Sequence, residues 1–135
     1  MTKPIPSIEK HMTPSPHAIS VTQPLSLAHA LMKQHDIRHL PVVDGGKLVG
    51  LLSVRDLHLI GSLKEVNPTK VSVSAAMSKE VYAVSPATPL HEVVNAMADH
   101  KYGCAVVMHN GKVVGIFTTV DVCRAFGELL SKRLA

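Results

Sequence analysis

Gly46-Lys-Leu-Val-Gly-Leu-Leu-Ser-Val-Arg-Asp56 recurs 65 residues later as Gly111-Lys-Val-Val-Gly-Ile-Phe-Thr-Thr-Val-Asp121. The likeness extends outward from this stretch, because residues 12–57 align with residues 77–122 without a gap, and thirteen of the 46 aligned positions are identical. Chance at average composition would give about three identities. The identical residues include Pro, Gly, His and Asp as well as common apolar types. The chain therefore contains an internal duplication, which sets its architecture.

Each copy predicts the same order of elements, β-α-β-β-α. Pro24 and Pro89 suit the first turn of a helix, and apolar residues then recur at i, i+3 and i+7, which indicates a helix with one buried face. Gly45-Gly46 and Asn110-Gly111 are typical of two-residue hairpin turns. The expected strands are 18–21, 40–43 and 47–52 in the first copy and 81–84, 105–108 and 112–117 in the second, and the last helices start at Ser53 and Thr118.

These repeats predict an α+β fold in which two β-α-β-β-α copies pack about a pseudo-two-fold axis. A copy of about 60 residues leaves one apolar sheet face uncovered and is marginally stable alone. The predicted boundaries are a first domain over residues 8–60, a linker over 61–72, a second domain over 73–127 and a C-terminal helix end over 128–135.

Composition narrows the class of protein. With 46% hydrophobic and 18% charged residues, the 135-residue chain is expected to fold. The net charge of +4 comes from scattered cations and aromatic residues make up 3%, so nucleic acid is an unfavoured partner. No apolar run approaches the ~18 residues of a membrane span, and two cysteines are too few for a disulfide framework. We expect a cytoplasmic protein with no membrane partner.

The pattern Gly, two apolar residues, Ser or Thr, two further residues and Asp closes both copies, at Ser53/Asp56 and Thr118/Asp121. It has a structural and a functional interpretation. A hydroxyl three residues before an acid resembles a capping box, in which both side chains serve only the helix start. Alternatively, a helix N-terminus binds phosphate, and an adjacent carboxylate can accept both hydroxyls of a ribose.

Taken together, these motifs resemble the cystathionine-β-synthase (CBS) domain, and the tandem pair resembles a Bateman module. The likeness runs from about Ile8 to Phe126. It implies a regulatory module that binds AMP, ADP, ATP, NAD or S-adenosylmethionine between the repeats and signals to an effector protein of unknown identity. Such modules have no catalytic cofactor, and they commonly form homodimers through their helices.

The resemblance also implies two crossed clefts, in which the motif of one copy holds ribose and phosphate while the other copy holds adenine. The residues that match these roles in the first cleft are Thr118, Asp121, His17, Ile37, Arg38 and His39. Those in the second cleft are Ser53, Arg55, Asp56, Val81, Tyr82, Tyr102, Gly103 and Cys104. Because Gly103 and Cys104 stand at the positions of Arg38 and His39, the second cleft lacks cations there and retains Arg55 alone. We therefore expect a phosphorylated ligand to prefer the cleft of Asp121.

Other chemistry finds little support. His35 and His39 are four residues apart, but a helix end is expected between them, so we predict no metal site. Lys47 precedes the last glycine of its segment, which is the wrong order for a P-loop. No base is identifiable for Cys104, so we predict that the chain is not an enzyme. Two alternatives stay open: a ligand-free structural dimerisation module, and a weak nucleic-acid binder.

The final helix, over residues 122–134, has one apolar face. We expect Val122 and Phe126 to pack into the core, and Cys123 as well because it lies mid-helix. Leu129, Leu130 and Leu134 lie beyond the repeat, so they offer apolar surface to a second copy or to a partner.

Overall fold

In the computed structural model the chain forms two compact units. One unit contains residues 17–81, and the other contains residues 1–16 together with residues 82–135. The structure describes residues 4–61 and 67–134, so residues 62–66 of the predicted linker and the last residue of the predicted C-terminal helix end lie outside the described residues. We call these units the first-repeat unit and the second-repeat unit.

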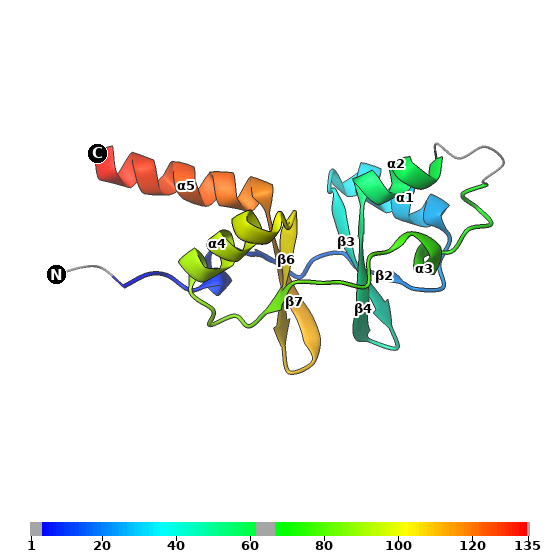
Figure 1. The fold of residues 1–135 in the computed structure, drawn as a ribbon, viewed down its shortest axis with the longest axis horizontal. Coiled ribbons are helices and arrows are strands. Elements are labelled where there is room, and N and C mark those ends of the chain that lie inside the picture. Colours follow the sequence, from blue (N-terminus) through cyan, green and yellow to red (C-terminus); the bar gives the residue numbers. More distant parts are fainter. Residues whose placement is uncertain (1–3, 62–66, 135) are drawn as a thin grey trace. The chain divides into compact units, whose positions relative to one another are not determined.

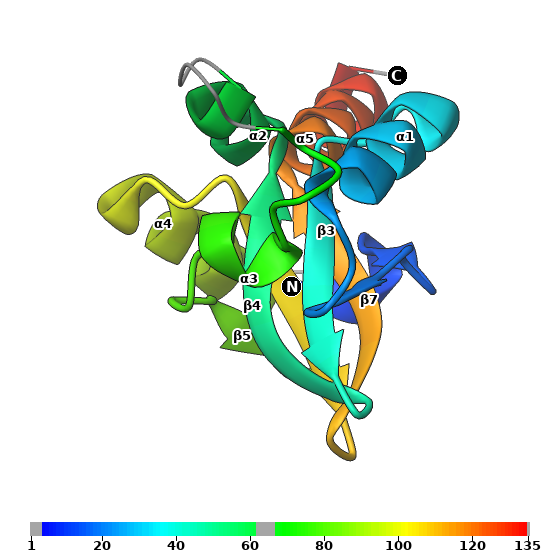
Figure 2. The same ribbon diagram turned by 90° about the vertical axis from the view of Figure 1, so that its right-hand side faces the viewer.

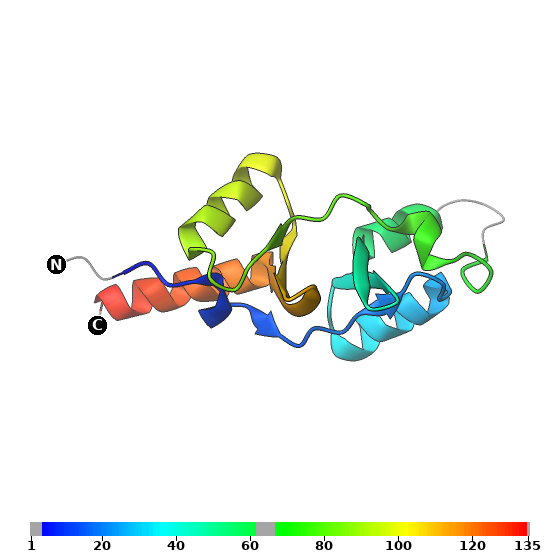
Figure 3. The same cartoon turned by 90° about the horizontal axis from the view of Figure 1, so that it is seen from below.

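The first-repeat unit has a three-stranded sheet of order β2-β3-β4, in which β2 is parallel to β3 and β3 is antiparallel to β4. Helices α1 and α2 lie on the same face of this sheet (Figures 1 and 3). Figure 2 shows the hairpin of β3 and β4 from the side of α3. The elements are β2 (Ile19–Ser20), α1 (Leu25–His35), β3 (His39–Asp44), β4 (Lys47–Ser53), α2 (Val54–Gly61) and α3 (Val73–Ala76).

The second-repeat unit has a four-stranded sheet of order β1-β7-β6-β5, and α4 and α5 lie on one face of it (Figures 1 and 3). Its last three strands and two helices repeat the topology of the first unit, with β5 parallel to β6 and β6 antiparallel to β7. The elements are η1 (Ile8–Lys10), β1 (Thr13–Pro14), β5 (Ala83–Val84), α4 (Leu90–His100), β6 (Cys104–His109), β7 (Lys112–Thr118) and α5 (Thr119–Leu134). The mixed α+β class is confirmed.

Local sequence accounts for most of these elements. The expected apolar stripes form the helix side of each core: Leu25, Ala28 and Met32 are buried on α1, and Val93 and Met97 on α4. Both hairpins close with two residues of positive φ. These are Gly45 and Gly46 in one unit and Asn110 and Gly111 in the other. Such a turn matches the twist of the strands that it joins.

The segment that precedes each repeat packs against the return strand of the other repeat, which the sequence did not predict. Thr13–Pro14 forms β1 and pairs antiparallel with β7 in the second-repeat unit. In the first-repeat unit Ser78 makes the corresponding bridge to Leu51 of β4. Glycines permit these close approaches. A Cβ atom on Gly115 would collide with the Met12 side chain, and one on Gly50 would lie 2.6 Å from the Met77 sulfur and 2.9 Å from the Ser78 carbonyl oxygen.

The predicted packing of the last helix is wrong at two positions. Phe126 is 59% exposed, and Cys123 is exposed as well. Because α5 continues to Leu134, its later turns extend past the sheet, and only its first turns reach the core, through Val122. Leu129 and Leu130 are exposed as expected, and the Leu134 side chain lies outside the described residues. None of the helices over residues 4–61 and 67–134 has the length and apolar character required to cross a membrane.

Candidate functional site

The first motif closes the junction between β4 and α2. Oδ2 of Asp56 accepts hydrogen bonds from the Ser53 backbone N–H at 2.8 Å and from the Ser53 hydroxyl at 3.0 Å. The Asp56 N–H in turn donates to the Ser53 hydroxyl at 3.2 Å. This reciprocal pair is a capping box, so the structural interpretation of the motif is correct as geometry. It uses one carboxylate oxygen, and Oδ1 of Asp56 accepts no hydrogen bond from any residue that the structure describes.

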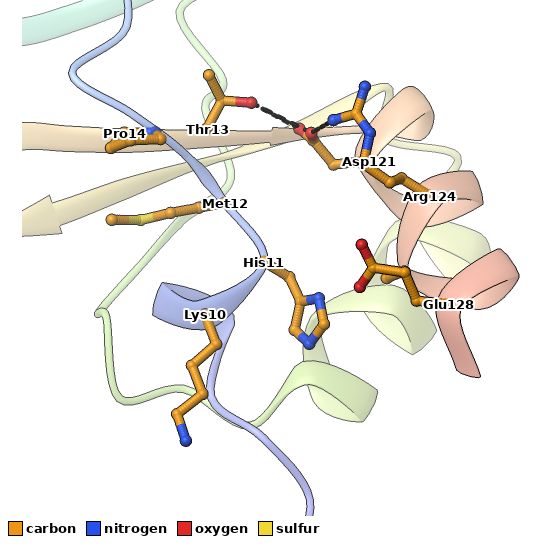
Figure 4. A pocket seen from close by; sticks show the side chains of 9 residues that line it. Lys10, His11, Met12, Thr13, Pro14, Asp121, Arg124 and Glu128 are labelled. Carbon is orange, nitrogen blue, oxygen red and sulfur yellow. Dashed lines mark hydrogen bonds and ion pairs between the residues drawn. The ribbon is translucent and has the colours of Figure 1, made fainter. Parts of the chain in front are cut away.

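The second motif repeats this arrangement between β7 and α5, and it adds two partners. Oδ2 of Asp121 accepts hydrogen bonds from the Thr118 N–H at 2.9 Å and from the Thr118 hydroxyl at 3.2 Å. Oδ1 accepts a hydrogen bond from the Thr13 hydroxyl at 3.1 Å, and it forms an ion pair with the Arg124 guanidinium at 3.3 Å (Figure 4). Asp121 is 5% exposed. Both of its oxygens are therefore occupied, and the carboxylate is buried.

The two acids differ because of residues outside the motif. Thr13 reaches Asp121 because β1 pairs with β7, whereas its counterpart Ser78 donates to the Glu80 carbonyl oxygen at 3.3 Å. Arg124 lies one helical turn after Asp121, and the aligned position in the first repeat is Leu59, which has no charge. Sequence analysis did not identify Thr13 or Arg124. The identical pairs Met12/Met77 and Gly50/Gly115 were the one available sign that these segments meet.

The predicted adenine-side residues of the first repeat gather around the end of α1. The His17 and His35 rings stack, with centroids 3.7 Å apart and planes 16° apart. Ile37 is half-buried and Arg38 is exposed. His39 pairs with Ser53 across β3 and β4. Burial lowers the pKa of His39 from 6.5, the Asp56 carboxylate opposes this shift, and Arg38 adds to it.

The aligned positions of the second repeat carry phenol rings. Tyr102 stacks on both Tyr82 and His100, with centroids 5.1 Å apart in each case. Burial raises the pKa of Tyr82, and Glu92 and Tyr102 add to the shift. Cys104 pairs with Thr118 across β6 and β7, and burial raises the pKa of its thiol from 9.0 to about 12.

The predicted site residues are divided between the two units. Those of the first-repeat unit are His17, Ile37, Arg38, His39, Ser53, Arg55, Asp56 and Val81. Those of the second-repeat unit are Tyr82, Tyr102, Gly103, Cys104, Thr118 and Asp121. Each predicted cleft takes residues from both units, so the crossed arrangement stays a prediction.

Two of the pockets formed by the described residues each lie within one unit. One of about 290 Å³ in the second-repeat unit contains Asp121 and Arg124; the remaining lining residues are Lys10, His11, Met12, Thr13, Pro14, Ala125 and Glu128 (Figure 4). The other, of about 650 Å³, is mainly apolar and lies between α1 and α2, where no predicted site residue lines it. Within residues 4–61 and 67–134, no three His, Cys, Asp or Glu side chains are grouped so that they could hold a metal ion.

The family comparison matches both repeats of the chain. The CBS domain model matches residues 1–59 and 73–128. The chain therefore belongs to the CBS domain family, and it contains a tandem pair.

Individual relatives support this assignment. The chain is 30% identical over 116 residues to the CBS domain-containing protein YhcV of Bacillus subtilis, covering 86% of this chain and 82% of YhcV. AcuB from Vibrio cholerae is similar in structure with a TM-score of 0.86 and 33% identity, covering 96% of each chain. The CBS domain pair of protein MJ0100 is similar with a TM-score of 0.81 and 26% identity, covering 93% of this chain and 98% of that one. That pair was solved in complex with 5′-methylthioadenosine and S-adenosyl-L-methionine.

Relatives that are named as enzymes match over only a small part of their length. In three of them the similarity covers between 21% and 25% of their own length. It therefore reaches a CBS module within a longer protein and does not extend to the rest of that protein.

Proposed function

We propose that this chain is a regulatory module that binds an adenosyl ligand, such as AMP, ADP, ATP, NAD or S-adenosylmethionine, and relays its presence to a partner protein. The observation that carries the proposal is the paired Ser/Thr-x-x-Asp motif at two strand-to-helix junctions. After helix capping, no donor among residues 4–61 and 67–134 reaches Oδ1 of Asp56. A free carboxylate oxygen at a helix start suits a ribose hydroxyl. The adenosyl ligands of the MJ0100 pair support the same ligand class.

In the proposed first cleft, Asp121 and Thr118 hold ribose and phosphate. The opposite side of the ligand meets His17, Ile37, Arg38 and His39. The exposed Arg38 guanidinium is the natural partner for a phosphate. This cleft is therefore assigned to a phosphorylated ligand.

In the proposed second cleft, Asp56 and Ser53 hold the ribose and Arg55 is the one cation. The adenine lies against the rings of Tyr82 and Tyr102, whose stacked faces suit an aromatic base. Val81, Gly103 and Cys104 complete the cleft. Because Gly103 and Cys104 stand at the positions of Arg38 and His39, and because two phenol rings add aromatic surface, this cleft is assigned to an unphosphorylated adenosyl ligand.

A second candidate function, a structural dimerisation module, is favoured by the surface of α5. Phe126 and Leu129 are each more than half exposed on this helix and Leu130 is 41% exposed. The three share one face of the helix, and a second copy that covers them would bury apolar area. Homodimerisation through α5 is compatible with ligand sensing. It becomes the whole function if no adenosyl ligand binds.

We also propose that the module is cytoplasmic and is not an enzyme. Cys104 and Cys123 are both unpaired, which suits a reducing compartment. A ligand changes the state of such a module only through different affinities for two arrangements of the chain. Its output is therefore a change in what it binds.

A thermal-shift panel of AMP, ADP, ATP, NAD and S-adenosylmethionine tests the proposal. A ligand at one hundred times its Kd adds about 2.7 kcal/mol, which raises Tm by roughly 3–6 °C for a domain of this size. The Asp56→Asn/Asp121→Asn double variant is the matched control and should lose the shift. No shift with any ligand would favour the structural dimer. Salt-sensitive binding to DNA or RNA that survives in the double variant would favour the nucleic-acid alternative.

A further inference from the structure

The ion pair between Arg124 and Asp121 gives the second motif a property that the first motif lacks. The Arg124 side chain is 65% exposed while Asp121 is 5% exposed, so the guanidinium reaches from the surface onto a buried carboxylate (Figure 4). Together with Thr13, it fills Oδ1 of Asp121. A ribose hydroxyl must displace one of these donors before it can bind there.

We propose that Arg124 is a specificity-determining residue that makes the Asp121 site select nucleotides over unphosphorylated nucleosides. The inference rests on the proposed function and concerns one of its two sites. A nucleoside has to compete with Arg124 for Oδ1, and it has no anionic group with which the Arg124 guanidinium could pair instead. A nucleotide brings an anion, which attracts the guanidinium away from Asp121 and so releases the oxygen for the ribose. Arginine forms strong charge-assisted hydrogen bonds with phosphate.

The pocket beside Asp121 provides a place for such an anion. Lys10 and His11 line it together with residues of α5. Two carboxylates, Asp121 and Glu128, balance the charges of Lys10 and Arg124. The pocket therefore exerts no strong overall attraction on an anion, and recognition depends on Arg124 changing its partner from Asp121 to the phosphate.

The first repeat supplies an internal control. Leu59 occupies the position of Arg124, and Oδ1 of Asp56 has no hydrogen-bond donor among the described residues. A nucleoside can therefore bind to Asp56 without displacing a cation. On this basis the two sites select different ligands, although their motifs match.

Isothermal titration calorimetry with AMP and with adenosine tests the assignment. The Asp56→Asn background leaves the Asp121 site to be measured, and Arg124→Leu then gives this site the residue of the first repeat. We expect Arg124→Leu to weaken AMP and strengthen adenosine, so that the preference for AMP falls about tenfold. Arg124→Lys, which keeps the charge, should retain most of the preference. In the Asp121→Asn background, Leu59→Arg should weaken adenosine at the Asp56 site.

The possible results distinguish a failure of the role of Arg124 from a failure of the proposed function. An AMP preference that is unchanged in Arg124→Leu would overturn the role of Arg124 and leave the proposed function intact. If the unsubstituted protein binds no adenosyl ligand at all, the proposed function fails, and this inference fails with it. Because Arg124 is largely exposed, Arg124→Leu is expected to fold, and its unliganded Tm verifies this.

Discussion

Asp56 and Asp121 occupy the same position of a duplicated motif, yet their carboxylates differ in how many hydrogen-bond partners they have. Within the described residues, one oxygen of Asp56 has partners, whereas both oxygens of Asp121 have them. Both cap a helix through Oδ2. Oδ1 of Asp121 is also bonded to Thr13 and Arg124, neither of which belongs to the motif. The difference teaches that matching motifs need not form equivalent sites, because residues brought in by strand pairing and by the next helical turn decide whether the acid is available.

The aligned positions that we assign to the adenine side differ as well. Where the first repeat has His17 and His39, the second has Tyr82 and Cys104. An imidazole becomes a cation when it binds a proton, whereas a phenol or a thiol becomes an anion when it loses one. The duplication thus preserved the fold while the charge of the two candidate sites diverged.

The largest expected effect separates the two acids by stability. Asp121→Ala removes the acceptor of four donor groups from a buried position and should cost about 3 kcal/mol of unfolding free energy. Asp56→Ala removes a half-exposed helix cap and should cost about 1 kcal/mol. Urea unfolding of both variants measures the difference. Equal losses would show that the extra partners of Asp121 contribute nothing.

The two motif glycines should also differ. A Cβ on Gly50 meets the Ser78 carbonyl oxygen, which belongs to the backbone and cannot move aside easily. A Cβ on Gly115 meets the flexible Met12 side chain. We expect Gly50→Ala to cost about 2 kcal/mol and Gly115→Ala about 1 kcal/mol.

Thermal and urea unfolding of the two glycine variants test this ranking. The Met12→Ala/Gly115→Ala double variant is the control, because removing the Met12 side chain should relieve part of the clash and give a non-additive loss. A larger loss for Gly115→Ala than for Gly50→Ala would contradict the account.

Acid and alkali should destabilise different repeats. The folded-state pKa of His39 is lowered from 6.5, so the unfolded chain binds the proton more readily and stability falls as the pH drops below 6.5. The folded-state pKa of Cys104 is raised from 9.0 to about 12, so stability falls as the pH rises above 9.0. At pH 10 this loss is about 1.4 kcal/mol.

Unfolding midpoints of His39→Gln and Cys104→Ala, measured across pH, show which residue causes each loss. We call the fall in stability at low pH the acid limb and the fall at high pH the alkaline limb. His39→Gln should flatten the acid limb alone, and Cys104→Ala should reduce the alkaline limb, to which Tyr82 also contributes because its pKa is raised. A Cys104→Ala variant with an unaltered alkaline limb would refute the assignment to the thiol.

The smallest expected effect belongs to the ion pair itself. With the Arg124 side chain 65% exposed, its bond to Asp121 should contribute about 0.5 kcal/mol to stability, and salt should screen it. A double-mutant cycle of Arg124→Leu and Asp121→Asn at low and high salt measures this coupling. A coupling several times larger would mean that Arg124 holds Asp121 too firmly to be drawn away by a ligand.

Much of the fold was predictable because it is recorded in local sequence. The period of the apolar residues placed α1 and α4, and Gly45-Gly46 placed a hairpin turn. The helix-capping interpretation of Ser53 and Asp56 was also available from their spacing, and the observed hydrogen bonds confirm it.

The remaining features depend on long-range contacts. Thr13 and Asp121 are 108 residues apart, and β1 is two residues long, too short to show alternation in the sequence. The exposure of Phe126 was missed for another reason. The helical period identifies an apolar face, but it does not indicate whether the sheet extends far enough to cover that face.

The central claim is that an adenosyl ligand lies between the acid of one repeat and the rings of the other. Tyrosine emission during titration with 5′-methylthioadenosine tests it directly, since the chain has two tyrosines, Tyr82 and Tyr102, and no tryptophan. We predict quenching in the unsubstituted protein that is lost in Asp56→Asn and retained in Asp121→Asn. Quenching that is lost in Asp121→Asn instead, or no quenching in any of the three proteins, would contradict the crossed arrangement.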